Sequence, residues 1–563
     1  MRVGEAVIRL LEARGVDVIF GIPGVHTIEF YRGLAGSSIR AITPRSEAGA
    51  GFMADAYARV TGRPGVCILV TGPGVTNAAT PIAEAFHDSI PLLVIAGAIA
   101  RPDAGRGHGP LHDLPDQAGL LSTITAISRV VADAAELPAL IESAWRSFET
   151  GRPRPVHVGV PTDLLEEEAD LGGVDIPVGA RTPATEADQR THPDPTLVRE
   201  AAALLADAAR PMVLLGGGAV DAGPEAITLA ELVDAPVAMT GNARGIVPSG
   251  HPLCLGSTLP LAPVQALFAE SDAVLLVGTE LSPVDTMYTG LPLAFGGPIV
   301  RIDIDPEQLH AKVSPAVAIG GDAAAVLGAL GAAVRERRAG QGTQRQSAAA
   351  DRPSSPPATP RTPGPARVRQ ALAAIEWSAQ TEGHRPWLDA LEAALPRDRI
   401  VAIDSTQLAY SAHHYMPAYR ARSWLAPYGF GTLGTALPQA IGAKIAAPDR
   451  PVVAITGDGG LLFTIGELAT AVDLGAPLPI IVWDNQGYGE IRDAFDRAGA
   501  PRIGTETTAR DLPAIARGFG CAAVEAEIPE RLGIEVSRAL SRRGPTLVHV
   551  LDPSHPRTKE LAP

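Results

Sequence analysis

The feature that most constrains the fold is a regular alternation of short apolar runs with longer, alanine-rich helical patterns. A first set of runs lies at 17–21, 65–70, 91–97 and 156–160. Further runs are PMVLL, PVAM, AVLLV and PIVRIDID in the middle of the chain, then RIVAID, PVVAIT, LPIIVWD and TLVHVLD after about residue 399. Parallel strands with helices on both faces produce such nearly continuous apolar runs. The sequence therefore predicts an α/β protein of three doubly wound parallel-sheet domains.

The length of the chain and one biased segment divide it into domains. The chain has 563 residues, of which 46% are hydrophobic, and this is enough for three domains of ordinary size. We place these domains at 1–180, 190–335 and 366–563. The intervening segment 336–365 is rich in Pro, Ser, Arg and Gln and lacks an apolar period. Such a composition is typical of an exposed, flexible linker, and we predict one there.

Charge and cysteine usage exclude several classes of protein. The net charge of −15 at pH 7 makes nucleic acid and an anionic membrane surface unsuitable partners. No apolar run is long enough to span a membrane, and the charged N-terminal helix pattern is unlike a signal peptide. Cys67, Cys254 and Cys521 lie far apart, which argues against a disulfide framework and a structural zinc site. We therefore expect a cytoplasmic protein.

A glycine turn that contains a single acid follows one of the predicted strands. PVVAIT predicts a buried strand, and Gly457, Asp458, Gly459 and Gly460 follow at its carboxyl end, where parallel sheets bind ligands. The glycines let backbone amides approach a phosphate. An aspartate there would repel the phosphate unless a cation lay between them, and Mg²⁺ prefers carboxylate and phosphate oxygens. A Gly-Asp-Gly turn on its own is more often a simple tight loop.

A second polar turn strengthens the magnesium interpretation. LPIIVWDNQG ends a neighbouring predicted strand and would bring the Asn485 side-chain oxygen and the Gly487 carbonyl to the same ion. GDG followed by DNQG at this spacing resembles the cofactor motif of thiamine diphosphate enzymes of the acetolactate synthase and 2-oxo acid decarboxylase family. That motif ends in two Asn residues. Asp484 replaces the first, so its hydrogen bonds are an open question, while Asn485 matches the second, which is the family's metal ligand.

The resemblance covers nearly the whole chain outside the linker. It implies a pyrimidine-binding domain at 1–180, a central domain at 190–335 and a diphosphate-binding domain at 366–563, with thiamine diphosphate and Mg²⁺ as cofactors. In acetolactate synthases the central domain holds FAD, but the glycine run GGGAVDAG is weak evidence for a nucleotide, so we do not expect FAD here. The family builds each active site from two subunits, which implies a homodimer or homotetramer with active sites between subunits.

The N-terminal part resembles the family around a glutamate. PRSEAGAGFMADAYAR (44–59) matches the catalytic-glutamate helix and puts Glu47 on the essential position. A carboxylate there would hydrogen-bond the aminopyrimidine ring and favour the tautomer that removes the C2 proton of thiamine. Without the resemblance, Glu47 is an acid at a helix start, which the helix dipole favours. The matching segments FGIPGVHTIEFY and TGPGVTNAAT imply cofactor contacts for Pro23 and Asn77 and a substrate contact for Val25.

The C-terminal part supplies further cofactor contacts by resemblance. LAPYGFGTLG matches the segment that bends the cofactor, with Leu433 as the apolar prop and Gly431 offering its carbonyl. Leu433 would otherwise be an ordinary core residue. DSTQ (404–407) matches the loop that reaches the diphosphate, and Gln407 is the implied contact.

Two segments are expected to face the substrate. GHGPLHDLPDQAG (107–119) places His112 where acetolactate synthases have Gln, as a candidate proton donor or acceptor, with Asp113 beside it. GYGEIRDAF places Glu490 where the decarboxylases usually present apolar residues. Glu490 would bind a cationic substrate, for which Asp113 and Asp404 are alternative anchors. Glu490 would otherwise face solvent or pair with Arg492 or Arg497 on its own helix.

The most specific resemblance concerns the reaction. PGVHTIEFYRGL, LHDLPDQ and GDGGLLFTIGELATAV resemble the 5-guanidino-2-oxopentanoate decarboxylases of this family. We therefore expect a lyase that releases CO₂ from a 2-oxo acid, with a guanidinium as the partner of Glu490. One alternative is an acetolactate synthase-type carboligase, which joins the decarboxylated fragment to a second carbonyl. Another is a non-catalytic subunit, against which intact Glu47, Asp458 and Asn485 argue.

Overall fold

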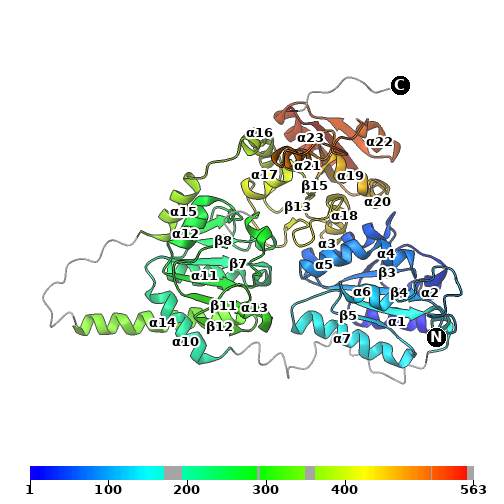
Figure 1. The fold of residues 1–563 in the computed structure, drawn as a ribbon, viewed down its shortest axis with the longest axis horizontal. Coiled ribbons are helices and arrows are strands. Elements are labelled where there is room, and N and C mark those ends of the chain that lie inside the picture. Colours follow the sequence, from blue (N-terminus) through cyan, green and yellow to red (C-terminus); the bar gives the residue numbers. More distant parts are fainter. Residues whose placement is uncertain (170–192, 288–291, 349–361, 509, 555–563) are drawn as a thin grey trace. The chain divides into compact units, whose positions relative to one another are not determined.

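Three parallel sheets, each flanked by helices, make up the fold of this computed structural model (Figure 1). The structure describes residues 1–169, 193–287, 292–348, 362–508 and 510–554. Each sheet has six strands, which confirms the prediction of three doubly wound α/β sheets. No helix within these described ranges is both long and apolar enough to cross a membrane.

The N-terminal sheet has the strand order β2-β1-β3-β4-β6-β5. Its strands are β1 (Val18–Phe20), β2 (Arg40–Ile42), β3 (Gly65–Leu69), β4 (Leu92–Ala98), β5 (Ile127–Val130) and β6 (Val156–Pro161). The helices of this part are α1 (Val3–Ala13), η1 (Val25–Thr27), α2 (Ile28–Leu34), α3 (Glu47–Thr61), α4 (Pro73–Asn77), α5 (Ala79–His87), α6 (Gln117–Ser122), η2 (Ala134–Glu136), α7 (Leu137–Thr150) and α8 (Thr162–Glu166).

The central sheet has the order β12-β11-β10-β7-β8-β9. Its strands are β7 (Pro211–Leu215), β8 (Val237–Met239), β9 (Cys254–Gly256), β10 (Ala273–Val277), β11 (Ile299–Asp303) and β12 (Val317–Gly320). The helices are α10 (Pro195–Asp207), η3 (Gly217–Ala219), α11 (Gly223–Val233), η4 (Gly241–Ala243), α12 (Ala262–Ala269), η5 (Pro283–Thr286), α13 (Pro306–His310), α14 (Ala323–Ala348) and α15 (Gly364–Ala373).

The C-terminal sheet has the order β14-β13-β15-β16-β18-β17. Its strands are β13 (Ile400–Ile403), β14 (Trp424–Leu425), β15 (Val452–Gly457), β16 (Leu478–Asp484), β17 (Ala522–Glu525) and β18 (Pro545–Leu551). The helices are α16 (Ala379–Ala394), α17 (Gln407–Tyr415), α18 (Ala436–Ala446), α19 (Asp458–Phe463), α20 (Glu467–Leu474), α21 (Gly489–Arg497), α22 (Leu512–Gly518) and α23 (Pro529–Ser541).

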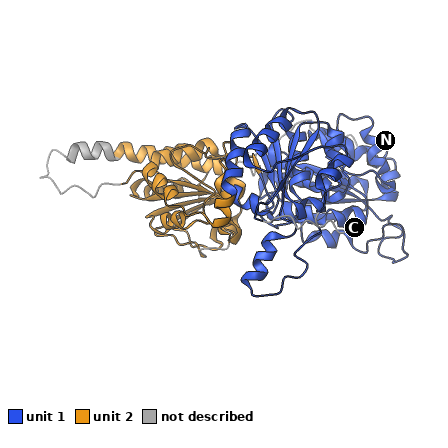
Figure 2. Ribbon diagram, turned by 90° about the horizontal axis from the view of Figure 1, so that it is seen from above, with its two compact units in different colours: residues 1–183, 384–412, 425–563 blue, residues 184–383, 413–424 orange. Residues whose placement is uncertain are grey.

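The three sheets fall into two compact units rather than three (Figure 2). Unit 1 comprises 1–183, 384–412 and 425–563, and therefore holds the N-terminal and C-terminal sheets together. One apolar core runs through it from Phe20 and Leu69 to Ala454 and Val482, by way of α3 and α18. Unit 2 comprises 184–383 and 413–424, with separate apolar clusters on the two faces of the central sheet.

The segment 336–365, expected to be a flexible linker, differs from that expectation over its first part. Helix α14 continues to Ala348, and α15 begins at Gly364. Residues 349–361 lie outside the described residues. The sequence ERRAGQGTQRQSA contains mostly Arg, Ala, Gln and Glu, which lose little side-chain freedom in a helix and so extend it.

Candidate active site

The C-terminal sheet brings the predicted metal and phosphate residues together at its carboxyl edge. Strands β13, β15 and β16 are parallel neighbours, so the turns that follow them meet at the same edge. Gln407 begins α17 after β13, Asp458 begins α19 directly after β15, and Asn485 follows β16. Three segments separated in sequence thus supply one group of polar side chains.

Asp458 is buried with only 5% of its surface exposed. Burial, and next the charge of Asp484, raise the pKa of Asp458 to about 7, although backbone amides of Asn485 and Gly459 donate to its carboxylate. No Lys, Arg or His of the described residues pairs with it. An ionised carboxylate in such a place is costly unless a cation compensates it. The surroundings of the Asp458 carboxylate therefore favour the binding of a cation.

The amide of Asn485 is held in one orientation by its neighbours. Its Nδ2 donates to Gln407 Oε1 at 3.1 Å, and Gln407 Nε2 donates to Asp493 Oδ2 at 2.8 Å. The opposite atom, Asn485 Oδ1, is buried and has no hydrogen-bond partner among the described residues. Leaving such an acceptor unpaired costs about 1–3 kcal/mol. The network thus leaves Oδ1, the atom that the sequence predicts as a metal ligand, without a hydrogen bond in the described part of the chain.

The glycines of the turn are required by close packing as well as by any ligand. A Cβ on Gly457 would lie 2.8 Å from Thr406 Oγ1, one on Gly459 2.9 Å from the Tyr488 ring, and one on Gly460 2.6 Å from Asp404 Oδ2. Gly487 has φ +156° and forms an isolated bridge with Glu506. These contacts pack the backbone tightly around Asp458, so its place in the turn is well defined.

Asp484, which departs from the family motif, has a hydrogen-bond partner on each of its carboxylate oxygens. Its Oδ2 lies 2.8 Å from His549 Nε2, and its Oδ1 accepts from the Gln486 amide at 2.9 Å. The Gln486 backbone has φ +60°, which places it in the left-handed region. Asp484 therefore stabilises the tight turn between Asn485 and Gly487, and this answers the question that its sequence position raised.

The donor set at this edge fits Mg²⁺ together with a diphosphate. Asp458, Asn485 Oδ1 and the Gly487 carbonyl are all oxygen ligands, and Mg²⁺ is commonly held by one or two carboxylates plus phosphate oxygens. No cluster of three or more His, Cys, Asp or Glu suited to a metal occurs in the described part of the chain. A site with a single acid therefore depends on the unpaired Asn485 oxygen and on ligands from the phosphate.

Asp404, which begins the DSTQ segment, serves the backbone beside this site. It is 2% exposed, and its carboxylate accepts from the Gly434 amide at 2.9 Å and from Thr456 Oγ1 at 3.2 Å. Burial raises the pKa of Asp404 to about 6. Through Gly434 it anchors the loop that carries exposed Gly431 and half-buried Leu433. It is therefore a support for the two predicted cofactor contacts, and its burial argues against contact with a substrate.

The N-terminal sheet collects the other predicted residues at its own carboxyl edge. Glu47 begins α3 after β2, and Asn77 ends α4 after β3. Asn77 Nδ2 donates to Glu47 Oε2 at 3.0 Å, so these two predicted residues are in contact. Pro23 and Val25 follow β1 and are exposed. Four successive loops of one sheet edge thus carry the predicted cofactor and substrate residues, since His112 and Asp113 follow β4.

A buried acid that the sequence reasoning missed holds the start of α3. Glu467 on α20 is 1% exposed and accepts from the backbone amides of Arg45 and Ser46, each at 3.0 Å. Ser46 in turn caps α3 by accepting from the Gly49 amide at 3.0 Å. Glu467 therefore fixes the residue next to Glu47. Its sequence signal was its place in GELATAV just after the glycine turn, but that pattern alone does not indicate its distant partner.

Within the described residues, no side-chain hydrogen bond joins the Glu47 group of the N-terminal sheet to the Asp458 group of the C-terminal sheet. Glu47 contacts Asn77, whereas Asn485 contacts Gln407 and the Asp458 group lies on the other sheet.

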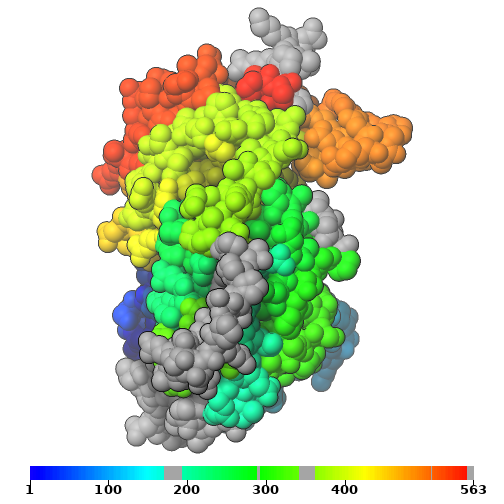
Figure 3. Space-filling view, turned by 90° about the vertical axis from the view of Figure 1, so that its left-hand side faces the viewer, coloured from blue at the N-terminus to red at the C-terminus, as the bar shows by residue number. Residues whose placement is uncertain are grey.

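Glu490 lies on α21, and the structure realises the alternative in which it pairs on its own helix. Its carboxylate is 3.1 Å from Arg497 Nη2, and its side chain is 41% exposed. In Figure 3 an orange projection, in the colour of residues near α21, stands out from the surrounding surface. The ion pair spans two helical turns because both side chains are long. A substrate cation would therefore have to replace Arg497.

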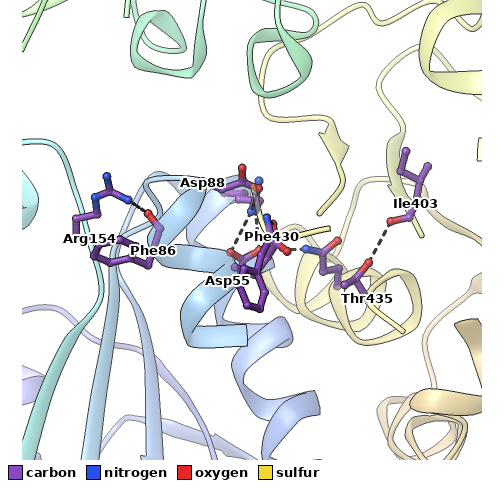
Figure 4. A network of polar contacts seen from close by, with 10 residues as sticks. Asp55, Phe86, Asp88, Arg154, Ile403, Phe430 and Thr435 are labelled. Atoms are coloured by element: carbon purple, nitrogen blue, oxygen red, sulfur yellow. Dashed lines mark hydrogen bonds and ion pairs between the residues drawn. The ribbon is translucent and has the colours of Figure 1, made fainter. Parts of the chain in front are cut away.

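A second buried network lies close to the Gly431 loop (Figure 4). Arg59 Nε donates to Asp55 Oδ1 at 2.6 Å and Nη2 donates to Asp88 Oδ2 at 2.7 Å. Glu84 is fully buried beside them, and burial, followed by the charge of Asp88, raises its pKa to about 9. Its Oε1 accepts from the Phe430 amide at 3.3 Å. The cluster therefore links α3 and α5 to the loop that holds Gly431.

Replacing Glu84 should change how stability depends on pH. A carboxyl with a raised folded-state pKa contributes stability below its unfolded pKa and loses it as pH rises towards the folded value near 9. Glu84→Gln removes this titration, so its melting temperature should exceed that of the wild type at pH 8.5 by more than at pH 5. Differential scanning calorimetry at both pH values measures this. Glu166→Gln, an exposed control, should show no such trend. A difference independent of pH would contradict the assignment.

The glycine run of the central sheet has a packing explanation. A Cβ on Gly216 would lie 2.5 Å from Thr279 Cα, and one on Gly218 2.9 Å from Gly278 Cα. The turns after β7 and β10 thus need glycine to pass each other. This run is accordingly not evidence for a bound nucleotide such as FAD.

Comparison with known protein families agrees with this arrangement. Residues 1–120 match the N-terminal TPP binding domain of thiamine pyrophosphate enzymes, 198–330 match the central domain, and 404–550 match the C-terminal TPP binding domain. The Glu47 group falls in the first match and the Asp458 group in the last.

Individual relatives align over almost the whole chain. A probable 2-ketoarginine decarboxylase of Pseudomonas aeruginosa is 41% identical over 97% of this chain and 93% of its own length. A probable acetolactate synthase large subunit of Methanocaldococcus jannaschii is 31% identical over 98% and 92%. The large subunit of acetolactate synthase isozyme 1 of Escherichia coli is 31% identical over 97% and 93%.

Proposed function

The chain belongs to the thiamine pyrophosphate enzymes, and on that premise we propose that it decarboxylates a 2-oxo acid with thiamine diphosphate and Mg²⁺. The observation that carries the cofactor assignment is the buried oxygen of Asn485 beside Asp458: in the described part of the chain this oxygen has no hydrogen-bond partner and Asp458 has no cationic partner. Bound thiamine diphosphate supplies an electron sink that accepts the electron pair left when CO₂ departs. Asp458, Asn485 and Gly487 would hold the metal, while Gln407 and the glycine turn would orient the diphosphate.

The remaining predicted residues have distinct proposed tasks. Glu47, oriented by Asn77, would hold a proton at the aminopyrimidine ring. Gly431 and Leu433 would position that ring, with Pro23 against it. His112 would exchange a proton near the reacting carbonyl.

We propose 5-guanidino-2-oxopentanoate as the substrate, and the support is the 41% identity to a probable 2-ketoarginine decarboxylase. Two carboxylates are candidates for its guanidinium. Glu490 is already paired with Arg497, whereas Asp113 is half-buried and its carboxylate has no partner among the described residues. An unpaired carboxylate matches the planar fork of a guanidinium.

A screen of 2-oxo acids for CO₂ release with thiamine diphosphate and Mg²⁺ tests the reaction. Release from the guanidino acid and not from pyruvate supports the proposal. The second candidate, an acetolactate synthase-type carboligase, is favoured by the 31% identity to acetolactate synthase subunits. Analysis of products with and without an acceptor aldehyde separates the two, because only a carboligase makes a longer product.

Substitution of Glu490 tests its share in substrate choice. The wild type should prefer 5-guanidino-2-oxopentanoate to 2-oxoisocaproate, and Glu490→Leu should narrow that preference. An exposed ion pair is worth roughly 0.2–1 kcal/mol, so we expect a change of about fivefold or less. Asp113→Asn, measured in parallel as kcat/KM for both substrates, should narrow it further. Equal ratios in all three proteins would remove both acids from the substrate site.

We propose a homodimer or homotetramer with active sites between subunits. Large apolar side chains are exposed near both halves of the site, including Val25 at 63%, Leu111 at 62% and Phe463 at 61%. A partner chain that completes the site would cover such residues. Sedimentation analysis tests this, and a monomer that is active at all concentrations would contradict it. The three cysteines are buried and free, which is compatible with the proposed cytoplasmic location.

A further inference from the structure

Two histidines from distant parts of the sequence lie against each other at the carboxyl edge of the N-terminal sheet. His26 belongs to η1, just after β1, and His112 lies in the loop that follows β4. Their ring centroids are 4.9 Å apart and the rings meet edge to face at 71°. This is the same sheet edge that carries Glu47 and Asn77. His26 is therefore a second histidine at the candidate site, next to Val25.

The surrounding backbone is built to admit this pair. A Cβ on Gly97 would lie 2.8 Å from the His26 carbonyl oxygen and 3.3 Å from its Cβ. A Cβ on Gly72 would lie 2.5 Å from the His112 carbonyl oxygen. His112 itself has φ +65°, a left-handed conformation that costs free energy in a residue other than glycine. Such a conformation persists only where the surrounding structure holds it in place, so the packing around His112 fixes the position of its ring.

The environment of the ring nitrogens fixes where the protons lie. In both residues Nδ1 is buried and has no hydrogen-bond partner, whereas Nε2 is neither bonded nor sealed from solvent, as far as the described residues extend. A buried N–H without an acceptor costs about 1–3 kcal/mol, so the proton of each neutral ring belongs on Nε2. Burial and then the nearby His112 lower the pKa of His26, which favours its neutral form. The pair thus presents two N–H donors on its accessible side.

We propose that His26 and His112 together bind the oxygen atoms of the 2-oxo acid, each donating one hydrogen bond from Nε2. This rests on the proposed function for the substrate class but not for the side chain, because every 2-oxo acid has the same carboxylate and keto group. Decarboxylation moves negative charge away from the carboxylate. Imidazole N–H donors hold that group with less ground-state stabilisation than an arginine would give, and they still favour charge on the keto oxygen.

Chemical modification tests the contact without relying on turnover. Diethyl pyrocarbonate reacts with accessible, neutral imidazole, and peptide mass spectrometry locates the product. In the enzyme loaded with thiamine diphosphate and Mg²⁺ at pH 7, we expect modification of His26, His112 and the exposed control His310. A saturating methyl acylphosphonate that carries the guanidino side chain, an analogue of 5-guanidino-2-oxopentanoate that cannot lose CO₂, should protect the pair and leave His310 reactive. Equal modification of the pair with and without the analogue would overturn the proposal.

Matched substitutions of His26 test the donor itself. His26→Gln retains an N–H donor near the position of Nε2, whereas His26→Leu removes it. Loss of one such donor typically lowers turnover by about 10²–10³-fold, so we expect that loss in kcat/KM for Leu and about tenfold or less for Gln. The loss should be equal for guanidino and apolar 2-oxo acids, and calorimetric affinity for thiamine diphosphate should be unchanged in both variants.

The outcomes separate this inference from the proposed function. Wild-type kcat/KM in His26→Leu, or an equal loss of kcat/KM in His26→Leu and His26→Gln, would overturn the proposal that His26 donates a hydrogen bond to the substrate. A wild type that turns over no 2-oxo acid would overturn the proposed function instead, and the protection experiment would still decide whether the pair binds the oxygens of a 2-oxo acid analogue.

Discussion

Asp458→Ala should bind thiamine diphosphate at least about 100-fold more weakly than the wild type. Residues that merely orient a metal ligand change metal affinity by about 10–100-fold, so loss of a direct charged ligand should equal or exceed that range. The reason lies in the site, where Asp458 is buried, has no cationic partner among the described residues and would link Mg²⁺ to the diphosphate. Isothermal titration of thiamine diphosphate in the presence of Mg²⁺ measures the effect.

Two controls isolate the role of the carboxylate. Asp484→Asn restores the family's pair of Asn residues and should keep nearly wild-type affinity, because an amide still accepts from the Gln486 amide. Removing Mg²⁺ with EDTA should reduce the affinity of the wild type strongly and that of Asp458→Ala much less. Wild-type affinity in Asp458→Ala would refute the assignment of the metal site.

The sequence predicted the inner strands of every sheet and missed every edge strand. The four central strands of each sheet, twelve in all, coincide with the twelve apolar runs of the sequence. The edge strands are not predicted by such runs; they are β2, β5, β9, β12, β14 and β17. Inner strands such as β3 and β10 are buried at every position. Edge strands β5 and β17 have no fully buried residue, so their composition resembles a loop. β5 and β17 therefore gave no continuous apolar run, whereas β9 and β14 are mostly buried but span only three and two residues.

Some residues of the candidate site can be predicted from contiguous sequence, and others depend on partners that are distant in the sequence. Asp458, Asn485 and Glu47 belong to short motifs, and a motif can be read from contiguous residues. Glu467 and His26 act through partners more than 80 residues away, Arg45 for the first and His112 for the second. The sequence also left open whether Glu490 pairs with Arg492 or with Arg497 on its own helix, and in the structure its partner is Arg497. Pairings of this kind follow from the fold and not from the local sequence.

Glu47→Gln should retain cofactor affinity while slowing proton exchange at C2 of thiamine diphosphate by about 10²–10⁴-fold, the usual contribution of a positioned proton-transfer group. The amide has the shape of the carboxylate and can still accept from Asn77 Nδ2, which lies 3.0 Å from Glu47 Oε2, so the start of α3 should be undisturbed. It cannot take up a proton at neutral pH, and this is the property that the proposed role requires. Deuterium exchange at C2, followed by NMR after acid quenching, measures the step, and calorimetry measures the affinity.

The neighbouring residue provides the matched control for this experiment. Ser46→Ala removes the N-cap of α3 and should cost about 1 kcal/mol of stability, but it leaves the Glu47 carboxylate in place. Its exchange rate should therefore stay close to that of the wild type, although its melting temperature falls. Asn77→Ser should lie between the two, because it weakens the hydrogen bond that orients Glu47 but keeps the carboxylate. Exchange in Glu47→Gln as fast as in the wild type would place the catalytic acid elsewhere, because a purely structural glutamate would affect stability, as Ser46 does, and leave the exchange rate unchanged.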